Sequence, residues 1–425
     1  MTDISMPEDL RDVIKGTIEG LHGFIETEVL PVEQEHRELL EDERKLFRED
    51  GRLTDVVGKA RDEIRQKSAK AGYYTMLTPE SIGGGGLPFS AVPFLMESIY
   101  RKYGPGRLYL TWAHGFLTSP LTASFVDGPS HLFVYAGETV RKEVLPALLA
   151  GDKTICFGLT EPDAGSDLWN LKTKARRDGD EWVINGTKQW ITNAPYASYA
   201  SIFAVTNDEM FAQHKGGISC FLVDTSLPGF QVTKIERIMG HVSSDCGSFS
   251  MEDVRVPNSY MMGNLDRAFE ISLFGVSEGR LGISAGCVGM SEWGLDRSLE
   301  YAQQRRTFGV PLSEHQAIQF MLADSAIEIF GAKLIVVQTA KLVDQVGHGG
   351  RMPVKEICIA KAYAVETAQR VFDRAIQIHG GMGLSSELML EEGFRIARTL
   401  RIPDGTSEIQ RRTIARQLLR GETVF

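Results

Sequence analysis

The stretch CFGLTEPDAGSD, residues 156–167, marks the point at which the chain changes from one kind of expected secondary structure to another. Before it, apolar residues recur every three or four positions, as they do on one face of a helix. After it come short runs rich in β-branched and aromatic residues, which favour strands. The stretch itself places glycine and small hydroxyl residues after an expected strand, a pattern that can bring backbone N–H groups close to an anion or to the polar edge of a ring.

On the N-terminal side of this stretch the sequence predicts helices. Leu10, Ile14 and Ile18 follow a helical period that continues to residue 25. The charged run at residues 33–52 is typical of a solvated helix or loop. The glycine run at residues 83–86 predicts a flexible loop, because neither a Walker lysine nor a preceding strand accompanies it.

On the C-terminal side the sequence predicts a β domain followed by more helices. Asn185-Gly186, between two β-rich runs, predicts a hairpin. From about residue 266 the helical period returns, with apolar residues spaced three and four apart at Phe320, Ala323, Ile327, Phe330, Leu334 and Val337. Four further stretches are strand candidates: SIFAVT (201–206), ISCFLVDT (218–225), FQVTKI (230–235) and FSMEDVRVP (249–257). The expected fold is therefore α+β and multi-domain, with a helical domain at residues 1–155, a β domain at 156–265 and a helical domain at 266–425.

Composition narrows the class of function. A chain of 425 residues is long enough for two or three domains. Its net charge of −10 argues against nucleic acid as a main partner. Five scattered cysteines indicate reduced, intracellular thiols, and no histidine pair has the spacing of metal ligands. No apolar run reaches the length of a membrane span and no signal peptide is visible, so we expect a bacterial cytoplasmic protein, with the mitochondrial matrix as the alternative.

Two further motifs suit a flat, nucleotide-bearing ligand. In KQWITN, residues 188–193, Trp190 and Thr192 share one face of a strand, where an indole could cover a ring and a hydroxyl could reach a ring nitrogen. A core tryptophan is the alternative reading. In RRTFGVPLSEHQAIQ, residues 305–319, arginine beside an aromatic side chain can pair with phosphate and cover an adenine. By contrast GISAG, residues 282–286, fits a nucleophile elbow but lies in a helical run, where small residues favour close helix packing.

Near the C-terminus, IPDGTSEIQ at residues 402–410 places the lone carboxylate of Asp404 between a proline and a glycine. Loops that carry chemistry often have this composition. Thr406 or Ser407 could equally cap the helix that is expected to follow. The residues alone leave both interpretations open.

Taken together and in this order, the motifs resemble those of the acyl-CoA dehydrogenase family. The resemblance covers nearly the whole chain and rests on LTEPDAGSD (159–167), WITN (190–193), MEDVRVP (251–257), RRTFG (305–309), QIHGGMG (377–383) and DGTSEIQ (404–410). It implies an N-terminal helical domain, a central β-barrel or sandwich domain and a C-terminal four-helix bundle. It also implies FAD as cofactor, acyl-CoA as substrate and a homotetramer.

The resemblance assigns roles to individual residues around the flavin. Trp190 is expected to shield one flavin face, with Ile191 beside it, and Thr192 is expected to hydrogen-bond near N5. Ser166 is expected near both the pyrophosphate and the acyl-CoA. The expected flavin edge is lined by Phe157, Leu159 and Thr160.

Other residues are expected to hold the rest of the cofactor and the substrate. The ADP half of an FAD bound mainly by a neighbouring subunit would contact Arg305, Phe308, Leu312, His315, Gln316, Gln377, Ile378, Gly380 and Gly381. Thr406 and Glu408 would touch the cofactor. Ser277, Arg280 and Gly405 are expected to contact the substrate, with Arg280 near the CoA moiety.

Asp404 occupies the position at which the family usually has a glutamate as catalytic base. An aspartate keeps the carboxylate but shortens its reach by one methylene, about 1.5 Å, which favours branched, cyclic or hydroxylated substrates. Some members place the base immediately before the arginine equivalent to Arg280, where this chain has Gly279. Glu278 lies one residue further and would point about 100° away on a helix, and it is the alternative base.

The resulting hypothesis is an FAD-dependent acyl-CoA dehydrogenase. It forms a 2,3-enoyl-CoA and passes electrons to an electron-transfer flavoprotein. Two alternatives remain: a flavoenzyme like the nitroalkane oxidases, which resemble this family and also use aspartate, and a catalytically silent relative that binds acyl-CoA or flavin.

Overall fold

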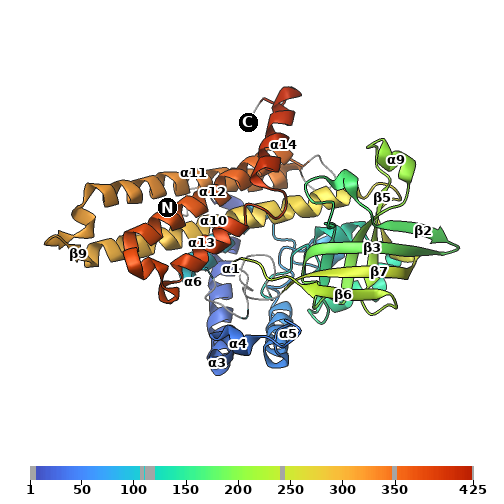
Figure 1. The fold of residues 1–425 in the computed structure, drawn as a ribbon, viewed down its shortest axis with the longest axis horizontal. Coiled ribbons are helices and arrows are strands. Elements are labelled where there is room, and N and C mark those ends of the chain that lie inside the picture. The colour runs from blue at the N-terminus through green and yellow to red at the C-terminus, as the bar shows by residue number, and fades with distance from the viewer. Residues whose placement is uncertain (1–5, 106–109, 111–119, 240–244, 347–351, 424–425) are drawn as a thin grey trace.

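The chain folds into a helical N-terminal part, a central sheet and a long C-terminal helical bundle (Figure 1). The structure is a computed structural model, and it describes residues 6–105, 110, 120–239, 245–346 and 352–423. The bundle and the sheet lie side by side along the longest axis, and the first helices lie below the junction in this view. The expected α+β architecture is confirmed.

The N-terminal part is built from one long amphipathic stretch and several short helices. Ile14 and Leu21 are buried on the inner face of α1, as their spacing predicts. The charged run forms two single-turn helices on the outer side. The helices are α1 (Arg11–Phe24), a π-helical turn (Ile25–Val29), α2 (Leu30–Glu35), α3 (Arg37–Leu40), α4 (Glu43–Leu46), α5 (Asp55–Lys70), α6 (Val92–Tyr103), α7 (Glu138–Glu143) and α8 (Leu145–Leu149).

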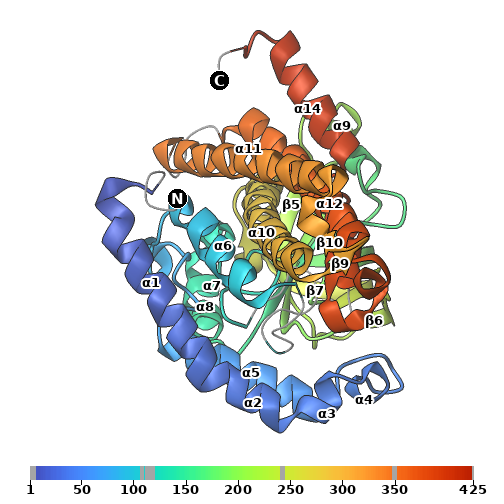
Figure 2. The ribbon, with the colours of Figure 1, turned by 90° about the vertical axis from the view of Figure 1, so that its left-hand side faces the viewer.

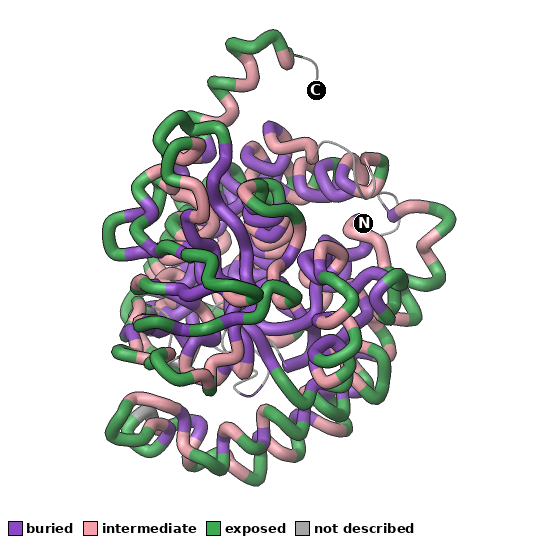
Figure 3. The backbone as a smooth tube through the Cα atoms, turned by 90° about the vertical axis from the view of Figure 1, so that its right-hand side faces the viewer, coloured by how far each residue is buried: buried purple, intermediate pink, exposed green. Residues whose placement is uncertain are grey.

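The central domain is an eight-stranded, mostly antiparallel sheet. Its strands run in the order β6-β7-β3-β2-β4-β5-β8, and β1 pairs in parallel with β4. Figure 3 views the molecule from the side of this domain and shows long buried stretches of backbone toward the middle, with exposed stretches around them. The elements are β1 (Ile155–Gly158), β2 (Lys174–Asp178), β3 (Glu181–Thr192), β4 (Tyr199–Val205), α9 (Asp208–Ala212), β5 (Ile218–Asp224), β6 (Phe230–Ile235), β7 (Cys246–Pro257) and β8 (Met261–Met262).

The hairpin predicted at Asn185-Gly186 is wrong, because β3 runs through both residues without turning. The register against β7 shifts between Ile184 and Gly186, so the pair forms a bulge. The Asn185 side chain exchanges hydrogen bonds with Asp253 across the sheet, at 3.0 and 2.9 Å. Gly186 has φ of 153°, and a Cβ there would lie 2.7 Å from Cα of Thr173. An Asn-Gly pair satisfies a bulge as well as a turn.

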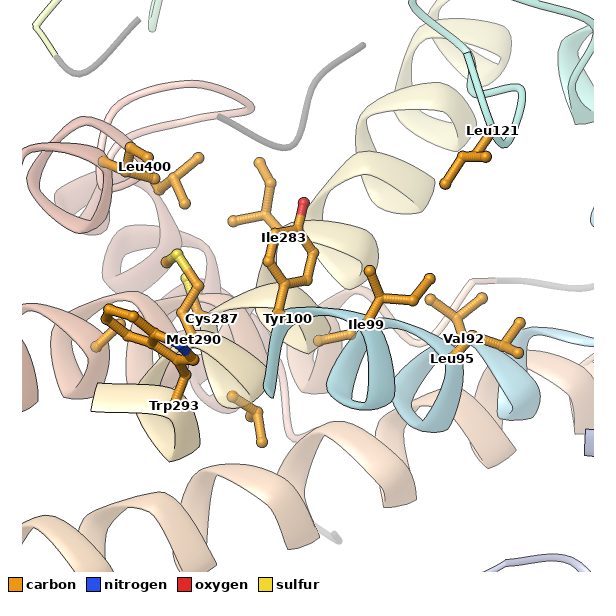
Figure 4. Close-up of a cluster of buried hydrophobic side chains, with 14 of the residues drawn as sticks. Val92, Leu95, Ile99, Tyr100, Leu121, Ile283, Cys287, Met290, Trp293 and Leu400 are labelled. Atoms are coloured by element: carbon orange, nitrogen blue, oxygen red, sulfur yellow. The ribbon is translucent and has the colours of Figure 1, made fainter. Parts of the chain in front are cut away.

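The C-terminal part is a bundle in which α10 packs against α6, α11 and α12 (Figure 2). Figure 4 shows apolar side chains of α6 facing those of α10. A Cβ on Gly289 would lie 2.8 Å from Cα of Glu97, so small residues do allow α10 to approach α6 closely. The elements are α10 (Phe269–Gln304), β9 (Arg306–Thr307), β10 (Val310–Pro311), α11 (Gln316–Val346), α12 (Val354–His379), α13 (Leu390–Thr399) and α14 (Ser407–Leu419). The GISAG stretch is helical throughout, within α10.

One face of α11 is apolar and uncovered in the single chain. Phe320, Ile327, Phe330 and Leu334, which the sequence pattern places on one stripe, are all exposed. At the end of the bundle far from the sheet, Phe308 is 97% exposed. Large apolar side chains gathered on one surface usually mark a contact with another molecule.

Candidate active site

Asp404 lies in the short loop between α13 and α14, where the backbone takes an uncommon conformation. Its φ is 55°, and that of Gly405 is 92°, so two consecutive residues are left-handed. Such backbone costs free energy for a residue with a side chain, and it is found most often at functional sites. Thr406 accepts a hydrogen bond from the N–H of Ile409 at 3.3 Å and caps α14. The expected cap is therefore confirmed at Thr406, and a chemical role for Asp404 stays a prediction.

Three buried side chains hold the backbone of this loop. Arg280 Nε donates to the carbonyl oxygen of Asp404 at 2.7 Å. Lys361 Nζ donates to the carbonyl oxygens of Pro403 and, at 2.7 Å, of Gly405. Gln410 Nε2 donates to the same Gly405 oxygen at 2.8 Å. Because all three loop carbonyls are bound, the position of the Asp404 Cα is fixed from α10, α12 and α14 at once.

One oxygen of the Asp404 carboxylate accepts no hydrogen bond from the described residues. This oxygen, Oδ2, is buried. Burial raises the pKa of Asp404, and the charges of Lys361 and Arg280 partly oppose this rise. A carboxylate with a raised pKa and an unpartnered oxygen is poised to take a proton from a ligand.

Gly279 gives this carboxylate its room. A Cβ at position 279 would collide with Asp404 Oδ2 and lie 2.6 Å from the ring of Phe125. The short aspartate thus reaches the surface of α10 at Gly279. Glu278, the alternative base, lines a neighbouring pocket instead.

The sheet domain meets this region through an edge-to-face aromatic contact. Phe157, on β1, packs edge-on against Phe125 with ring centroids 5.0 Å apart. On the other side, Thr399 at the end of α13 donates from Oγ1 to the carbonyl oxygen of Met239 at 2.6 Å. The base loop, α10 and the sheet are therefore near neighbours.

A buried ion pair holds the segment Leu159–Glu161 against the sheet. Lys188 Nζ lies 2.7 Å from Glu161 Oε1 and donates to the carbonyl oxygens of Leu159 and Phe203 at 3.1 and 2.8 Å. Glu161 also accepts from the N–H of Thr173 at 3.1 Å. The segment expected to line the flavin edge is thus rigidly placed.

Trp190 is turned out of the sheet by a second irregularity. The register of β3 against β7 shifts between Lys188 and Ile191, and Trp190 has φ of 60° and is 51% exposed. The alternative reading, a core tryptophan, is therefore wrong. Its neighbour Ile191 is buried in the sheet core, so only its backbone is available to a ligand.

Small polar groups beside this indole are free to bind. The hydroxyls of Thr160, Ser166 and Thr192 make no hydrogen bond within the described part of the chain, and these residues are half-buried or exposed. No atom outside its own neighbours lies within 4 Å of where a Cβ of Gly165 would stand. On α10, Ser277 Oγ is buried and finds no partner among described residues.

A second set of expected cofactor residues lies at the far end of the bundle, at the β9 end in Figure 1. Tyr301 and His379 stack with ring centroids 4.3 Å apart and join the ends of α10 and α12 there. Phe308 is again left-handed, with φ of 50°. The set comprises Arg305, Phe308, Leu312, His315, Gln316, Gln377, Ile378, Gly380 and Gly381, of which Ile378 is buried. A single chain does not bring this set to Asp404.

These residues fit FAD in two separate halves. An exposed indole beside unpaired hydroxyls suits a flat ring with a polar edge. Gly380 and Gly381 have open space where a Cβ would stand, and Arg305 precedes the exposed Phe308 by three residues in the sequence. That combination has the space and the positive charge to accept a phosphate-bearing group.

Sequence reasoning missed the side chains that hold the base loop. Lys361, Gln410 and Phe125 lie in ordinary helical or loop patterns, and their roles come from contacts over long sequence separations. The one available signal was a lysine amid the small apolar residues of α12. Glu408, expected to touch the cofactor, is exposed on the first turn of α14.

A largely apolar pocket of about 80 Å³ opens beside Gly279, between α6 and α10. Glu278 is the one charged residue among the described residues that line it. The lining is Leu77, Phe89, Val92, Met96, Thr122, Ala123, Ser124, Phe125, Val126, Glu278, Gly279, Leu281, Gly282 and Ile283.

The described residues hold neither a metal-binding cluster nor a membrane-spanning helix. No cluster of histidine, cysteine, aspartate or glutamate suited to a metal ion occurs among them. None of the helices described is both long enough and apolar enough to cross a membrane.

The family models, the relatives and the solved structures that match this chain include acyl-CoA dehydrogenases in each case. Residues 156–254 match the family model described as acyl-CoA dehydrogenase, middle domain, and residues 269–419 match acyl-CoA dehydrogenase, C-terminal domain. The chain is 38% identical over 366 residues to "Probable acyl-CoA dehydrogenase YngJ" of Bacillus subtilis, covering 86% of this chain and 92% of that one.

Two further relatives extend the comparison. The chain is 34% identical over 363 residues to "Caffeyl-CoA reductase-Etf complex subunit CarC" of Acetobacterium woodii, covering 85% and 91% of the two chains. The fold matches a solved glutaryl-CoA dehydrogenase from Mycobacterium smegmatis in complex with FADH2, with a TM-score of 0.77 and 27% identity over 100% of this chain and 97% of that one.

Proposed function

This chain belongs to the acyl-CoA dehydrogenase family, and from that premise we propose that it oxidises an acyl-CoA to the 2,3-enoyl-CoA with Asp404 as catalytic base. That it is an FAD-containing oxidoreductase acting on acyl-CoA follows from its relatives. The observation that carries the proposal is the unpartnered, buried oxygen of Asp404, in a loop whose three carbonyls are held.

The chain's own residues account for the proton transfer. Asp404 takes the α-proton on Oδ2, and its raised pKa brings its basicity closer to that of the acid it must deprotonate. FAD, when bound, supplies the acceptor for the β-hydride. Arg280, Lys361 and Gln410 keep the base from moving as the proton arrives, and an error of one ångström there can cost about a hundredfold in rate.

The FAD site we propose is shared between subunits. Trp190 covers one face of the ring, and Thr160 and Thr192 reach its polar edge. Residues at the far end of the bundle, around Arg305 and Gly380, hold the ADP half for a neighbouring copy. The other residues expected to contact the cofactor or the substrate, among them Ser166 and Glu408, keep the roles that the resemblance implies.

A homotetramer follows from the same proposal. The exposed apolar stripe of α11, from Phe320 to Leu334, and the exposed Phe308 support a buried interface between copies. Light scattering with the purified protein tests it: a monomer that retains FAD would refute it.

We further propose an electron-transfer flavoprotein as the acceptor, and a bacterial cytoplasmic location. The support is a relative named as part of an Etf complex and another from Bacillus subtilis. Because one relative is named a reductase, the enoyl-CoA should also be tested as an oxidant of the reduced protein.

The substrate class we propose is an acyl-CoA that is branched, cyclic or hydroxylated. It follows from the aspartate, whose carboxylate stays close to α10 over Gly279. The test is anaerobic mixing of the holoenzyme with straight, branched, cyclic and hydroxylated acyl-CoAs while flavin absorbance is followed. Bleaching by members of the panel supports the function, and the failure of every one refutes it.

The division into residues 1–155, 156–265 and 266–425 is likewise a proposal. Expression of residues 156–265 alone tests it: a cooperative unfolding transition of the fragment supports the central boundary pair.

A further inference from the structure

Glu278 is a carboxylate that the proposed reaction does not use, yet it stands in the wall of the apolar pocket beside the base. It follows Ser277 on α10 and precedes Gly279, over which the Asp404 carboxylate lies. Its side chain is 14% exposed, and the surrounding lining includes Phe89, Met96 and Leu281. A charged group in such surroundings is costly unless a partner compensates for it.

The described residues supply only weak compensation for this charge. Glu278 Oε2 is buried and accepts no hydrogen bond from the described residues. The imidazole of His131 faces this oxygen, but its Nδ1 lies 3.7 Å away, beyond hydrogen-bond distance. The His131 ring is held by stacking on Phe89, with centroids 4.7 Å apart, so it does not readily move closer.

The two other polar side chains that line the pocket are Ser124, which already makes a hydrogen bond, and Thr122, which is neutral. Ser124 donates its hydroxyl to Asp127 at 2.8 Å and so points its proton away from a ligand. Within the described lining, Glu278 is therefore the group that would decide between an apolar and a polar ligand.

We propose that Glu278 selects acyl-CoA substrates whose acyl chain carries a hydrogen-bond donor, a hydroxyl or an ammonium group, beyond the reacting carbons. This inference rests on the proposed function and names the substrate class of the same site. The donor binds the carboxylate of Glu278, and the apolar wall from α6 packs against the rest of the acyl chain. An unsubstituted chain leaves the carboxylate desolvated and unpaired, which is what makes the site selective.

The experiment compares matched thioesters on the holoenzyme. Butanoyl-, hexanoyl- and octanoyl-CoA are each paired with analogues bearing one hydroxyl or one ammonium group, placed at successive carbons beyond the β-carbon. Anaerobic flavin reduction gives kcat/KM for each. We expect the best polar analogue to exceed its unsubstituted partner by about tenfold to a hundredfold, the usual range for a hydrogen bond to a charged group.

Variants assign the preference to this residue. Glu278→Met should abolish or reverse it by making the wall apolar. Glu278→Gln separates the two donors, because an amide still accepts from a hydroxyl but no longer attracts an ammonium. Glu270→Gln removes an exposed carboxylate from the first turn of the same helix and should leave the ratio unchanged. FAD content and thermal midpoint monitor folding.

The outcomes are distinct. Equal use of polar and unsubstituted chains by the wild type, or a preference that survives in Glu278→Met, overturns the inference and leaves the dehydrogenase function standing. If no thioester of either kind reduces the flavin, the proposed function fails and the inference falls with it.

Discussion

Replacing Lys361 with methionine tests whether the base loop is held and tuned from α12. Lys361 Nζ donates to the carbonyl oxygens of Pro403 and Gly405, and it is buried. Burial lowers the pKa of Lys361 to about 8, so it is charged at neutral pH. The substitution keeps the length and apolar bulk of the side chain while removing both hydrogen bonds and the charge.

Two opposing terms set the expected loss of stability. Two hydrogen bonds from a charged donor are worth about 3–6 kcal/mol together. Removing a buried ammonium returns part of that, since its desolvation costs several kcal/mol. We expect the free energy of unfolding to fall by about 1–3 kcal/mol, which denaturant titration of the holoenzyme can measure.

The effect on the base has a definite sign. The charge of Lys361 lowers the pKa of Asp404, against the larger rise caused by burial. Without that charge the pKa of Asp404 rises further, and the base is protonated over a wider range of pH. The acidic limb of the kcat/KM profile should therefore move to higher pH.

A matched control separates this effect from general damage. Lys355 is buried on the same helix, but its Nζ donates to the carbonyl oxygen of Glu422 at 2.8 Å, away from the base loop. Lys355→Met should lower stability without moving the acidic limb. An acidic limb in Lys361→Met that coincides with that of the wild type, or an equal shift in both variants, would refute the reasoning.

Three further outcomes are expected. Asp404→Asn should retain FAD and lower turnover by about 10²–10⁴-fold. Because the pKa of Asp404 is raised in the folded state, the wild type loses stability as the pH rises above the pKa of the unfolded chain, and the variant should be the more stable protein at neutral pH. Thermal unfolding should show this advantage vanishing below about pH 4. Gly279→Ala should lower kcat about a hundredfold with unchanged FAD content, because the new methyl displaces the Asp404 carboxylate, and wild-type kcat would contradict this. Lys188→Met leaves Glu161 buried without its cation and should cost about 3–5 kcal/mol in chemical denaturation, whereas a loss under 1 kcal/mol would count against a rigid flavin-edge segment.

Sequence patterns predicted what depends on neighbours in the chain. The helical period before residue 156, the strand runs after it and the cap at Thr406 all reflect local chemistry, and the structure has helices, strands and a cap at those places. The Asn-Gly pair failed because the same two residues satisfy a bulge and a turn. Which one forms depends on Asp253, which pairs from another strand.

The support of the base could not be predicted for the same reason. Nothing near Lys361 in the sequence indicates that it reaches the loop at residues 403–405. The motif singled out Asp404 as a candidate base, which stays a prediction, whereas the lack of a described partner for its Oδ2 depends on contacts that α10 and α12 make with the loop.

Because position 279 is a glycine, the substitutions that the site can accept at positions 279 and 404 depend on each other. The side chains at positions 279 and 404 would occupy the same small volume next to Phe125, so both residues cannot be large. Substitutions at the two positions should therefore covary among relatives: a chain with a larger residue at position 279 should have a smaller residue at position 404. A designer who wishes to move the acid from one element to the other has to exchange both residues in a single step.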